Sequence, residues 1–308
     1  MAAASVSCKI LPMRLAGAFA PLTTPFAPDG SVALNRLREN IARYNTTRLS
    51  GYTINGSTSE SVLLTWDEVY QVWEAAREAA APYKTLIAGA GAEATMETIT
   101  HTNRAAELGY DVALIRTPSF YKPAISDTML LEHYLRVADA SRIPVMIYSV
   151  PVFTHVTVKA PLVARIAEHE NIVGMKDSSG DVEEIGNISA ATPDDFQLLC
   201  GSAATLYESL KRGAVGAIVA AACAFPELFA DICELTAAGQ DERARAQQQK
   251  LIAPAKLLVQ CGIAGLKYAL DQLGYYGGAP RLPLLPPNEE TRRSIDEMVA
   301  GVLSKSAA

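Results

Sequence analysis

The sequence lacks the cysteine and histidine spacing that a disulfide framework or a metal site requires. Its five cysteines are odd in number and scattered, without any C-x-x-C pair (Cys8, Cys200, Cys223, Cys233 and Cys261), and its four histidines are equally far apart (His101, His133, His155 and His169). We therefore expect no bound metal and a reducing compartment, the cytoplasm. We also expect most of the histidines to be solvated residues of helices or loops.

The chain has no excess of positive charge and no apolar run long enough to cross a bilayer. Its 27 lysines and arginines face 33 acidic residues, which gives a formal net charge of −6. We expect neither nucleic acid nor an anionic membrane as a partner. Segment 1–21 lacks the layout of a signal peptide, but it is basic and free of acidic residues, so an organelle transit peptide stays open.

What the sequence does contain is a regular alternation of short apolar runs and longer amphipathic stretches. The runs have the length of strands and are almost continuously apolar, which is typical of strands covered on both faces by helices. They are Gly17–Leu22, Gly51–Asn55, Thr85–Gly89, Val112–Arg116, Pro144–Ser149, Ile172–Lys176, Phe196–Gly201 and Ala214–Ala220. Helical patterns between them include Leu34–Tyr44, Trp66–Ala80, Thr95–Leu108, Asp127–Ala140 and Ala203–Lys211.

Eight such strand–helix units predict an α/β fold, a (β/α)8 TIM barrel with parallel strands. Further helical patterns follow the eighth run, at Pro226–Ala238, Asp241–Val259, Leu266–Leu273 and Glu289–Leu303. No low-complexity linker separates a second domain. We therefore predict a single domain over residues 1–308, with the barrel at about 14–238 and a C-terminal helical extension at about 239–308.

Lys176 is the first candidate for chemistry. Active sites of such barrels lie at the C-terminal ends of the strands, and Lys176 is the only one of ten lysines that directly closes an apolar strand. An amine in such a place can form a Schiff base with a carbonyl compound when it is neutral, and apolar surroundings favour the neutral form. The alternative is a solvated lysine at the rim of the barrel.

Two further segments supply groups that this chemistry needs. Tyr148 closes the preceding strand, and a tyrosine hydroxyl beside a cationic imine can move protons, although a strand-end tyrosine is more often a packing residue. Gly56-Ser57-Thr58-Ser59-Glu60 follows the second strand, and its hydroxyl and backbone N–H groups suit a carboxylate. Ser57-x-x-Glu60 also matches a capping box for the next helix, and both interpretations can hold together.

These segments, in this order, resemble the dihydrodipicolinate synthase/N-acetylneuraminate lyase superfamily of class I aldolases. The resemblance extends from Gly17–Phe26 to Gly262–Lys267, nearly the whole chain. Asn171–Ser178, Ile147–Pro151 and Leu273–Gly278 are most similar to the 4-hydroxy-2-oxoglutarate aldolase branch. The joint occurrence of these segments is more specific than any one of them, and it favours the catalytic interpretation of Lys176.

The resemblance implies a role for each candidate residue. Lys176 would form the imine, Tyr148 would move protons, Ser57 would join the hydroxyl relay, and Thr58 with nearby backbone amides would hold the carboxylate of pyruvate or a related 2-oxo acid. The other expected substrate-binding residues are Gly56, Phe153, Ser178, Gly201 and Ile218. The second substrate or product would be an aldehyde. The resemblance further implies a homotetramer and no cofactor, since the iminium itself accepts the electrons.

The chain departs from the family pattern at several positions. Phe153 stands where dihydrodipicolinate synthases have an arginine that binds the carboxylate of aspartate semialdehyde, so a charge-assisted contact of about 1.5–3 kcal/mol is missing and that reaction is disfavoured. Phe120 stands where the family has a tyrosine donated across a subunit interface, and Tyr121 follows one position later. Ser59 and His155 replace family glycines at loops that shape the pocket.

A glycine-rich motif offers another function, which we disfavour. Gly89-Ala90-Gly91-Ala92-Glu93-Ala94 matches the G-x-G-x-x-A form of the dinucleotide fingerprint, and Asp111 follows at about the right distance. The acidic residue of that fingerprint belongs at the C-terminal end of the next strand, whereas Asp111 precedes Val112–Arg116. Nicotinamide binding is therefore not expected.

The leading functional hypothesis is a Schiff-base lyase that cleaves or forms a C–C bond with pyruvate, such as 4-hydroxy-2-oxoglutarate aldolase. Two alternatives share Lys176: an enzyme of the dihydrodipicolinate synthase type, and a 2-oxo-3-deoxy sugar-acid aldolase or dehydratase. A third alternative is a non-catalytic protein that binds a 2-oxo acid for regulation, which the phenylalanine at position 120 keeps open.

Overall fold

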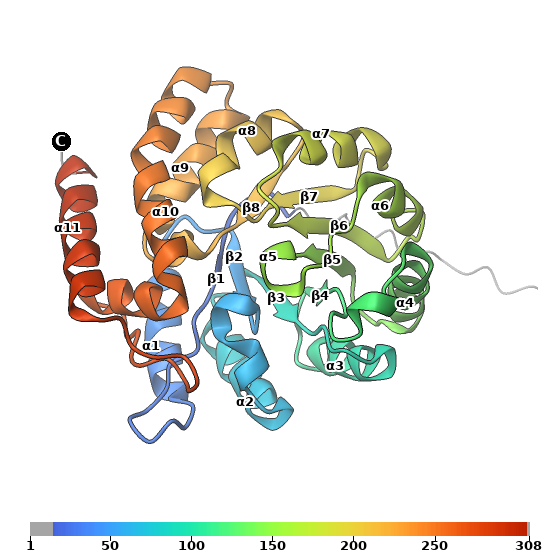
Figure 1. Cartoon of the computed structure of the whole chain (residues 1–308), viewed down its shortest axis with the longest axis horizontal. Helices are drawn as coiled ribbons and strands as arrows, with labels where there is room; N and C mark the ends of the chain where they lie inside the picture. The colour runs from blue at the N-terminus through green and yellow to red at the C-terminus, as the bar shows by residue number, and fades with distance from the viewer. Residues whose placement is uncertain (1–14, 307–308) are drawn as a thin grey trace, which may run out of the picture.

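The computed structural model describes residues 15–306, and its centre is a closed barrel of eight parallel strands in sequential order. Helices surround the barrel on the outside (Figure 1). The strands are β1 (Gly17–Pro21), β2 (Gly51–Ile54), β3 (Thr85–Gly89), β4 (Val112–Arg116), β5 (Val145–Ser149), β6 (Ile172–Asp177), β7 (Gln197–Cys200) and β8 (Gly216–Ile218). The predicted (β/α)8 barrel with a C-terminal helical extension is confirmed.

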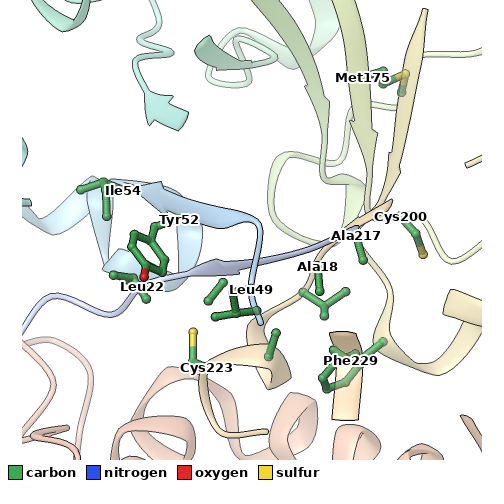
Figure 2. Close-up of a cluster of buried hydrophobic side chains, with 14 of the residues drawn as sticks. Ala18, Leu22, Leu49, Tyr52, Ile54, Met175, Cys200, Ala217, Cys223 and Phe229 are labelled. Carbon is green, nitrogen blue, oxygen red and sulfur yellow. The ribbon is translucent and has the colours of Figure 1, made fainter. Parts of the chain in front are cut away.

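The strands separate the apolar core into an inner and an outer part, because successive side chains of a strand point to opposite faces. On β5, Met146 and Tyr148 belong to the cluster inside the barrel, whereas Val145 and Ile147 belong to the cluster between the barrel and its helices. Figure 2 shows part of this outer cluster, in which the side chains of Tyr52, Leu49, Ala18 and others lie beside β1 and β2. This alternation decides which strand-end residues face the barrel mouth.

Three of the helices that cover the barrel, α2, α4 and α7, begin with a side-chain cap. Thr65 caps α2 in a reciprocal capping box with Glu68, and Ser126 and Asp181 cap α4 and α7. The helices are α1 (Leu34–Tyr44), α2 (Trp66–Ala79), α3 (Thr95–Glu107), α4 (Asp127–Ala140), α5 (Pro151–Thr154), α6 (Ala160–Ile166), α7 (Val182–Ala191), α8 (Leu206–Lys211) and α9 (Pro226–Ala237). The helical patterns found in the sequence agree with these bounds within a few residues, but they did not include α5, α6 or α7.

The C-terminal extension consists of α10 (Asp241–Gln272) and α11 (Glu289–Ser306), which lie side by side at one flank of the barrel (Figure 1). Gly262 interrupts α10 with φ 64° and ψ −163°. Glycine adopts this backbone conformation readily, whereas it is strongly unfavourable for residues that have a side chain. The break explains why the sequence predicts two separate helices here.

One prediction, that most histidines are solvated, needs correction, and another, on a transit peptide, falls mostly outside the described residues. His101 and His133 are buried, not solvated: His101 stacks on Trp66, with ring centroids 3.2 Å apart, and burial lowers the pKa of His133 to about 4. The expectation about a transit peptide concerns residues that lie mostly outside the described part of the chain. None of the helices over residues 15–306 is long and apolar enough to span a membrane.

Candidate active site

Lys176 and Tyr148 lie side by side at the mouth of the barrel. They are paired in the register of β5 and β6, and both belong to the inward-facing positions of their strands, since Met175 and Ile147 contact the outer cluster. The Nζ atom of Lys176 is 4.2 Å from the centroid of the Tyr148 ring, and only 5% of the surface of Lys176 is exposed. The structure therefore places the amine in a largely dry position next to a phenol.

Ser57 completes this group from the other side. It begins the short 3-10 helix η1 (Ser57–Ser59) that follows β2, and its Oγ atom is 3.1 Å from the Oη atom of Tyr148. Either hydroxyl can donate this hydrogen bond, so a proton can pass between them. Three segments that are far apart in the sequence thus bring an amine and two hydroxyl groups together.

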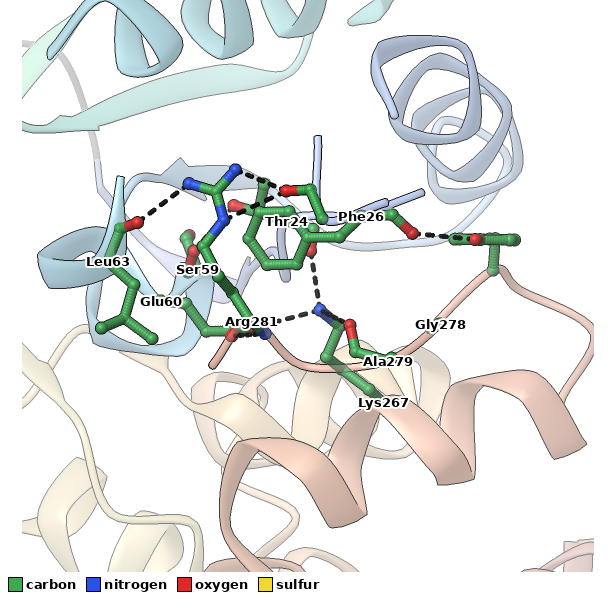
Figure 3. Close-up of polar contacts among 12 residues, drawn as sticks. Thr24, Phe26, Ser59, Glu60, Leu63, Lys267, Gly278, Ala279 and Arg281 are labelled. Atoms are coloured by element: carbon green, nitrogen blue, oxygen red, sulfur yellow. Dashed lines mark hydrogen bonds and ion pairs between the residues drawn. The ribbon is translucent and has the colours of Figure 1, made fainter. Parts of the chain in front are cut away.

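The loop that carries Ser57 is held by buried polar contacts. Thr24 Oγ1 donates to the Ser59 carbonyl at 2.7 Å, and Ser59 Oγ donates to the Leu22 carbonyl at 2.5 Å. Glu60 ends the turn with φ 59°, and its Oε1 atom lies 2.8 Å from Nζ of Lys267 on α10. Figure 3 shows this ion pair. Both of its side chains have no exposed surface.

The contacts of Glu60 correct the predicted capping box. The Ser57 side chain caps no helix, and the Glu60 carboxylate instead accepts from Lys267 and from the backbone N–H of Arg281 at 2.8 Å. The real capping box is Thr65 with Glu68, and Glu68 also binds the guanidinium of Arg281 in a bidentate manner. The C-terminal segment is therefore anchored by two acidic residues, Glu60 in the loop after β2 and Glu68 on α2.

Two other ionisable groups near Lys176, Asp177 and Cys223, are buried, and burial favours the neutral form of each. Burial raises the pKa of Asp177, although the Ser179 hydroxyl and backbone N–H donate to its carboxylate. Burial also raises the pKa of the Cys223 thiol well above its usual value, although the field of Lys176 acts in the opposite direction, and the thiol donates to the Pro21 carbonyl at 3.1 Å. Cys223 is therefore a packing residue and not a nucleophile.

A cavity of about 270 Å³ opens beside Ser57 and Tyr148, and Lys176 is not among the residues that border it. It is bordered by Gly56, Ser57 and Tyr148, which the sequence predicts as site residues, and by Asn55, Glu93 and Arg116, which it does not. Asn55 Nδ2 donates to the Gly89 carbonyl at 2.8 Å and so links the ends of β2 and β3. Arg116 is the last residue of β4, and a charged residue at the end of an apolar strand is the sequence signal that could have identified it.

The remaining predicted residues lie around the barrel mouth without bordering this cavity. Ile218 is fully buried in the inner cluster at the end of β8, and Thr58 lies in η1. Ser178 and Gly201 touch each other, since a Cβ atom on Gly201 would lie 2.0 Å from Oγ of Ser178. Phe153 is 63% exposed on α5.

The glycine-rich motif after β3 has a structural explanation. A Cβ atom on Gly89 would lie 2.1 Å from the Asn55 carbonyl oxygen, and one on Gly91 would lie 2.6 Å from the backbone nitrogen of Arg116. Asp111 accepts a hydrogen bond from the Leu86 backbone at 2.8 Å, at the opposite end of the strands. The glycines thus permit close backbone packing at the barrel mouth.

The fold and the site together define a class of protein. A buried lysine on a barrel strand, with a tyrosine and a serine hydroxyl in contact beside it, is the arrangement of a class I aldolase, a carbon–carbon lyase that works through an imine. No group of three His, Cys, Asp or Glu side chains in residues 15–306 is placed to hold a metal ion.

Comparison with known proteins gives the family. The family described as the dihydrodipicolinate synthetase family matches residues 14–301, and the chain belongs to it. The chain is 32% identical over 299 residues to the 4-hydroxy-tetrahydrodipicolinate synthase of Xanthomonas campestris pv. campestris, covering 96% of this chain and 97% of that protein. The family consists of pyruvate-dependent class I lyases, so the enzyme class is settled, whereas the 4-hydroxy-2-oxoglutarate aldolase branch is not singled out by these matches.

Solved structures agree with this assignment. The 4-hydroxy-tetrahydrodipicolinate synthase of Methylacidiphilum fumariolicum SolV has a TM-score of 0.91 and 26% identity, covering 96% of this chain and 98% of that one. The dihydrodipicolinate synthase of Acinetobacter baumannii, solved as a complex with pyruvate, has a TM-score of 0.90 and 28% identity, covering 94% and 99%.

Proposed function

We propose that this chain is a lyase that forms or cleaves a C–C bond of pyruvate through a Schiff base on Lys176. The observation that carries the proposal is the contact of Lys176 with Tyr148, whose hydroxyl is 3.1 Å from that of Ser57. Burial keeps water away from the amine, and the two hydroxyl groups supply the proton path that imine formation needs. Thr58 with neighbouring backbone amides holds the carboxylate of the 2-oxo acid.

In the cleavage direction, Nζ of Lys176 adds to the C2 carbonyl of the substrate, and water leaves as the iminium forms. Tyr148 moves the protons of this step and then removes the proton of the C4 hydroxyl. The C3–C4 bond breaks, its electron pair moves into the iminium to give an enamine, and an aldehyde departs. Protonation at C3 and hydrolysis of the imine release pyruvate and restore the amine.

Two partners of pyruvate are supported by different observations. The names of the curated relatives support 4-hydroxy-tetrahydrodipicolinate synthase activity, in which pyruvate condenses with aspartate semialdehyde. Phe153 supports the second candidate, 4-hydroxy-2-oxoglutarate aldolase, because a neutral ring replaces the arginine that a synthase uses to bind that aldehyde. The comparisons give the synthase more support than the aldolase that the sequence alone favours.

The imine is tested by trapping. Borohydride reduction in the presence of pyruvate should place a stable adduct on Lys176, and Lys176→Met should remove both the adduct and at least about a thousandfold of the activity. Lys211→Met is the matched control, since that lysine lies on the surface and pairs with Asp241 at 2.9 Å. An adduct on another residue in an active enzyme would overturn the mechanism.

The acceptor is tested by comparing substrates on the same preparation. Turnover with aspartate semialdehyde, with 4-hydroxy-2-oxoglutarate and with 2-oxo-3-deoxygluconate separates the synthase, the aldolase and the sugar-acid enzyme. Pyruvate binding without exchange of its methyl protons would instead support a regulatory protein. The homotetramer and the cytoplasmic location remain expectations of the same proposal.

A further inference from the structure

We propose that Arg116 binds an anionic group on the aldehyde end of the substrate and so determines acceptor specificity. This inference rests on the proposed function, because it assigns the part of the substrate beyond the pyruvyl group. Three observations support it: the direction of the side chain, its partners and its place in the cavity.

The register of the barrel places Arg116 in the same row as the catalytic pair. Arg116 is the partner of Tyr148 across β4 and β5, as Tyr148 is the partner of Lys176 across β5 and β6. On β4, Val112 and Leu114 face the inside of the barrel, whereas Ala113 and Ile115 face the helices. The alternation therefore directs Arg116 inward, about two strand spacings of roughly 4.8 Å from Lys176.

The guanidinium is held at one edge by Glu93. Nη1 of Arg116 donates to Oε1 of Glu93 at 2.7 Å. The other carboxylate oxygen of Glu93, Oε2, accepts from the backbone N–H groups of Ser119 and Phe120 at 2.8 and 3.0 Å. Burial works against ionisation of Glu93, but these hydrogen bonds together hold its pKa below the usual value. Glu93 thus orients the arginine and the loop after β4 as one unit.

The rest of the guanidinium is available to a ligand. Within residues 15–306, the hydrogen bonds of the Arg116 side chain to Glu93 and to the Thr117 carbonyl are both made by Nη1. Nε and Nη2 form the other edge of the planar fork, which matches the two oxygens of a carboxylate. The side chain is 23% exposed and borders the same cavity as Ser57 and Tyr148.

The chemistry of this position suits the distal end of the substrate. The pyruvyl carboxylate is assigned to the hydroxyl loop after β2, and the loop after β5 offers Phe153, which carries no charge. The carboxylate of an anionic aldehyde such as glyoxylate, bound next to C3 of the enamine, pairs with the guanidinium of Arg116 on β4. Arg116 therefore supplies a charge that the position of Phe153 lacks.

The test compares an anionic and a neutral acceptor in condensation with pyruvate. Arg116→Met should lower kcat/KM for glyoxylate about tenfold to a hundredfold and leave acetaldehyde within about twofold, and Arg116→Lys should lose less. Arg142→Met, which removes a surface arginine paired with Glu107 at 2.8 Å, should change neither. Borohydride trapping of pyruvate on Lys176 should be unaffected in every variant.

Two results would overturn the inference. Equal losses with both acceptors, or no loss with glyoxylate, would mean that Arg116 does not bind the anionic end. Loss of pyruvate trapping in Arg116→Met would place the arginine at the pyruvyl group. If the wild type itself traps no pyruvate, the proposed function fails, and calorimetric binding of glyoxylate to the wild type and to Arg116→Met still tests the anion site.

Discussion

Tyr148 contacts both other groups of the candidate site. Its ring lies against the amine of Lys176, while its hydroxyl meets Ser57. Removing the hydroxyl keeps the ring and therefore the packing. It breaks the hydrogen bond between Tyr148 and Ser57, which over residues 15–306 is the only one that joins the side chains of Lys176 or Tyr148 to the loop after β2. Tyr148→Phe thus separates proton transfer from structure.

We expect Tyr148→Phe to lower kcat about a hundredfold to ten-thousandfold, in the usual range for loss of an acid–base group. Pyruvate should still be trapped on Lys176, but more slowly. Tyr110→Phe is the control, because that buried hydroxyl donates to the Trp73 carbonyl at 3.1 Å, away from the mouth, and should have little effect on kcat. An unchanged kcat in Tyr148→Phe would exclude the assigned role.

At the scale of elements, the C-terminal extension holds the loop after β2 that carries Ser57 and Glu60. Lys267 on α10 makes hydrogen bonds to Glu60 and to the carbonyls of Thr24 and Ala279, at 2.8 to 3.0 Å (Figure 3). Burial lowers the pKa of Lys267, whereas the Glu60 carboxylate acts to raise it. A buried ion pair of this kind contributes little relative to apolar packing, but removing one partner leaves an uncompensated charge.

Lys267→Met should therefore lower the free energy of unfolding by about 3–5 kcal/mol, measured by urea denaturation. The double variant with Glu60→Leu should recover part of this loss, since it removes the stranded carboxylate. Lys256→Met, an exposed lysine of the same helix, should stay within about 0.5 kcal/mol. A loss below about 1 kcal/mol in Lys267→Met would show that the pair does not hold the loop.

For the molecule as a whole, exposed apolar side chains gather in the segments that follow β2 to β5. Six of them are 63–78% exposed: Val62, Met96, Phe120, Tyr121, Val152 and Phe153. Monomeric proteins seldom expose so many large apolar side chains in one region. These segments border the same end of the barrel as the candidate site. A contact between copies of the chain at this face would bring Phe120 and Tyr121 near a neighbouring site.

We expect the protein to self-associate through this face, and a homotetramer would have about four times the mass of the 32.9 kDa chain. Phe120→Glu together with Val152→Glu should reduce the assembly in sedimentation velocity experiments. Val259→Glu, at a 75% exposed position on α10, should leave it intact. A wild-type protein that sediments as a single chain at micromolar concentration would contradict the expectation.

The sequence by itself determined the barrel and pointed to Lys176 and Tyr148 as the candidate pair. Continuous apolar runs at regular spacing define buried parallel strands, and strand ends define where chemistry lies, so Lys176 and Tyr148 could be found without coordinates. Short helices such as α5 and α6 escaped because four to seven residues carry too little periodicity.

Only the tertiary structure decided which polar groups surround Lys176 and Tyr148. Glu60 and Lys267 are 207 residues apart, and local pattern assigned Glu60 to a helix cap because no local signal reports a partner at such a distance. The direction of Arg116 likewise depends on the barrel register, which the closure of all eight strands fixes together. Local periodicity specifies elements, whereas long-range contacts and register specify which polar groups meet.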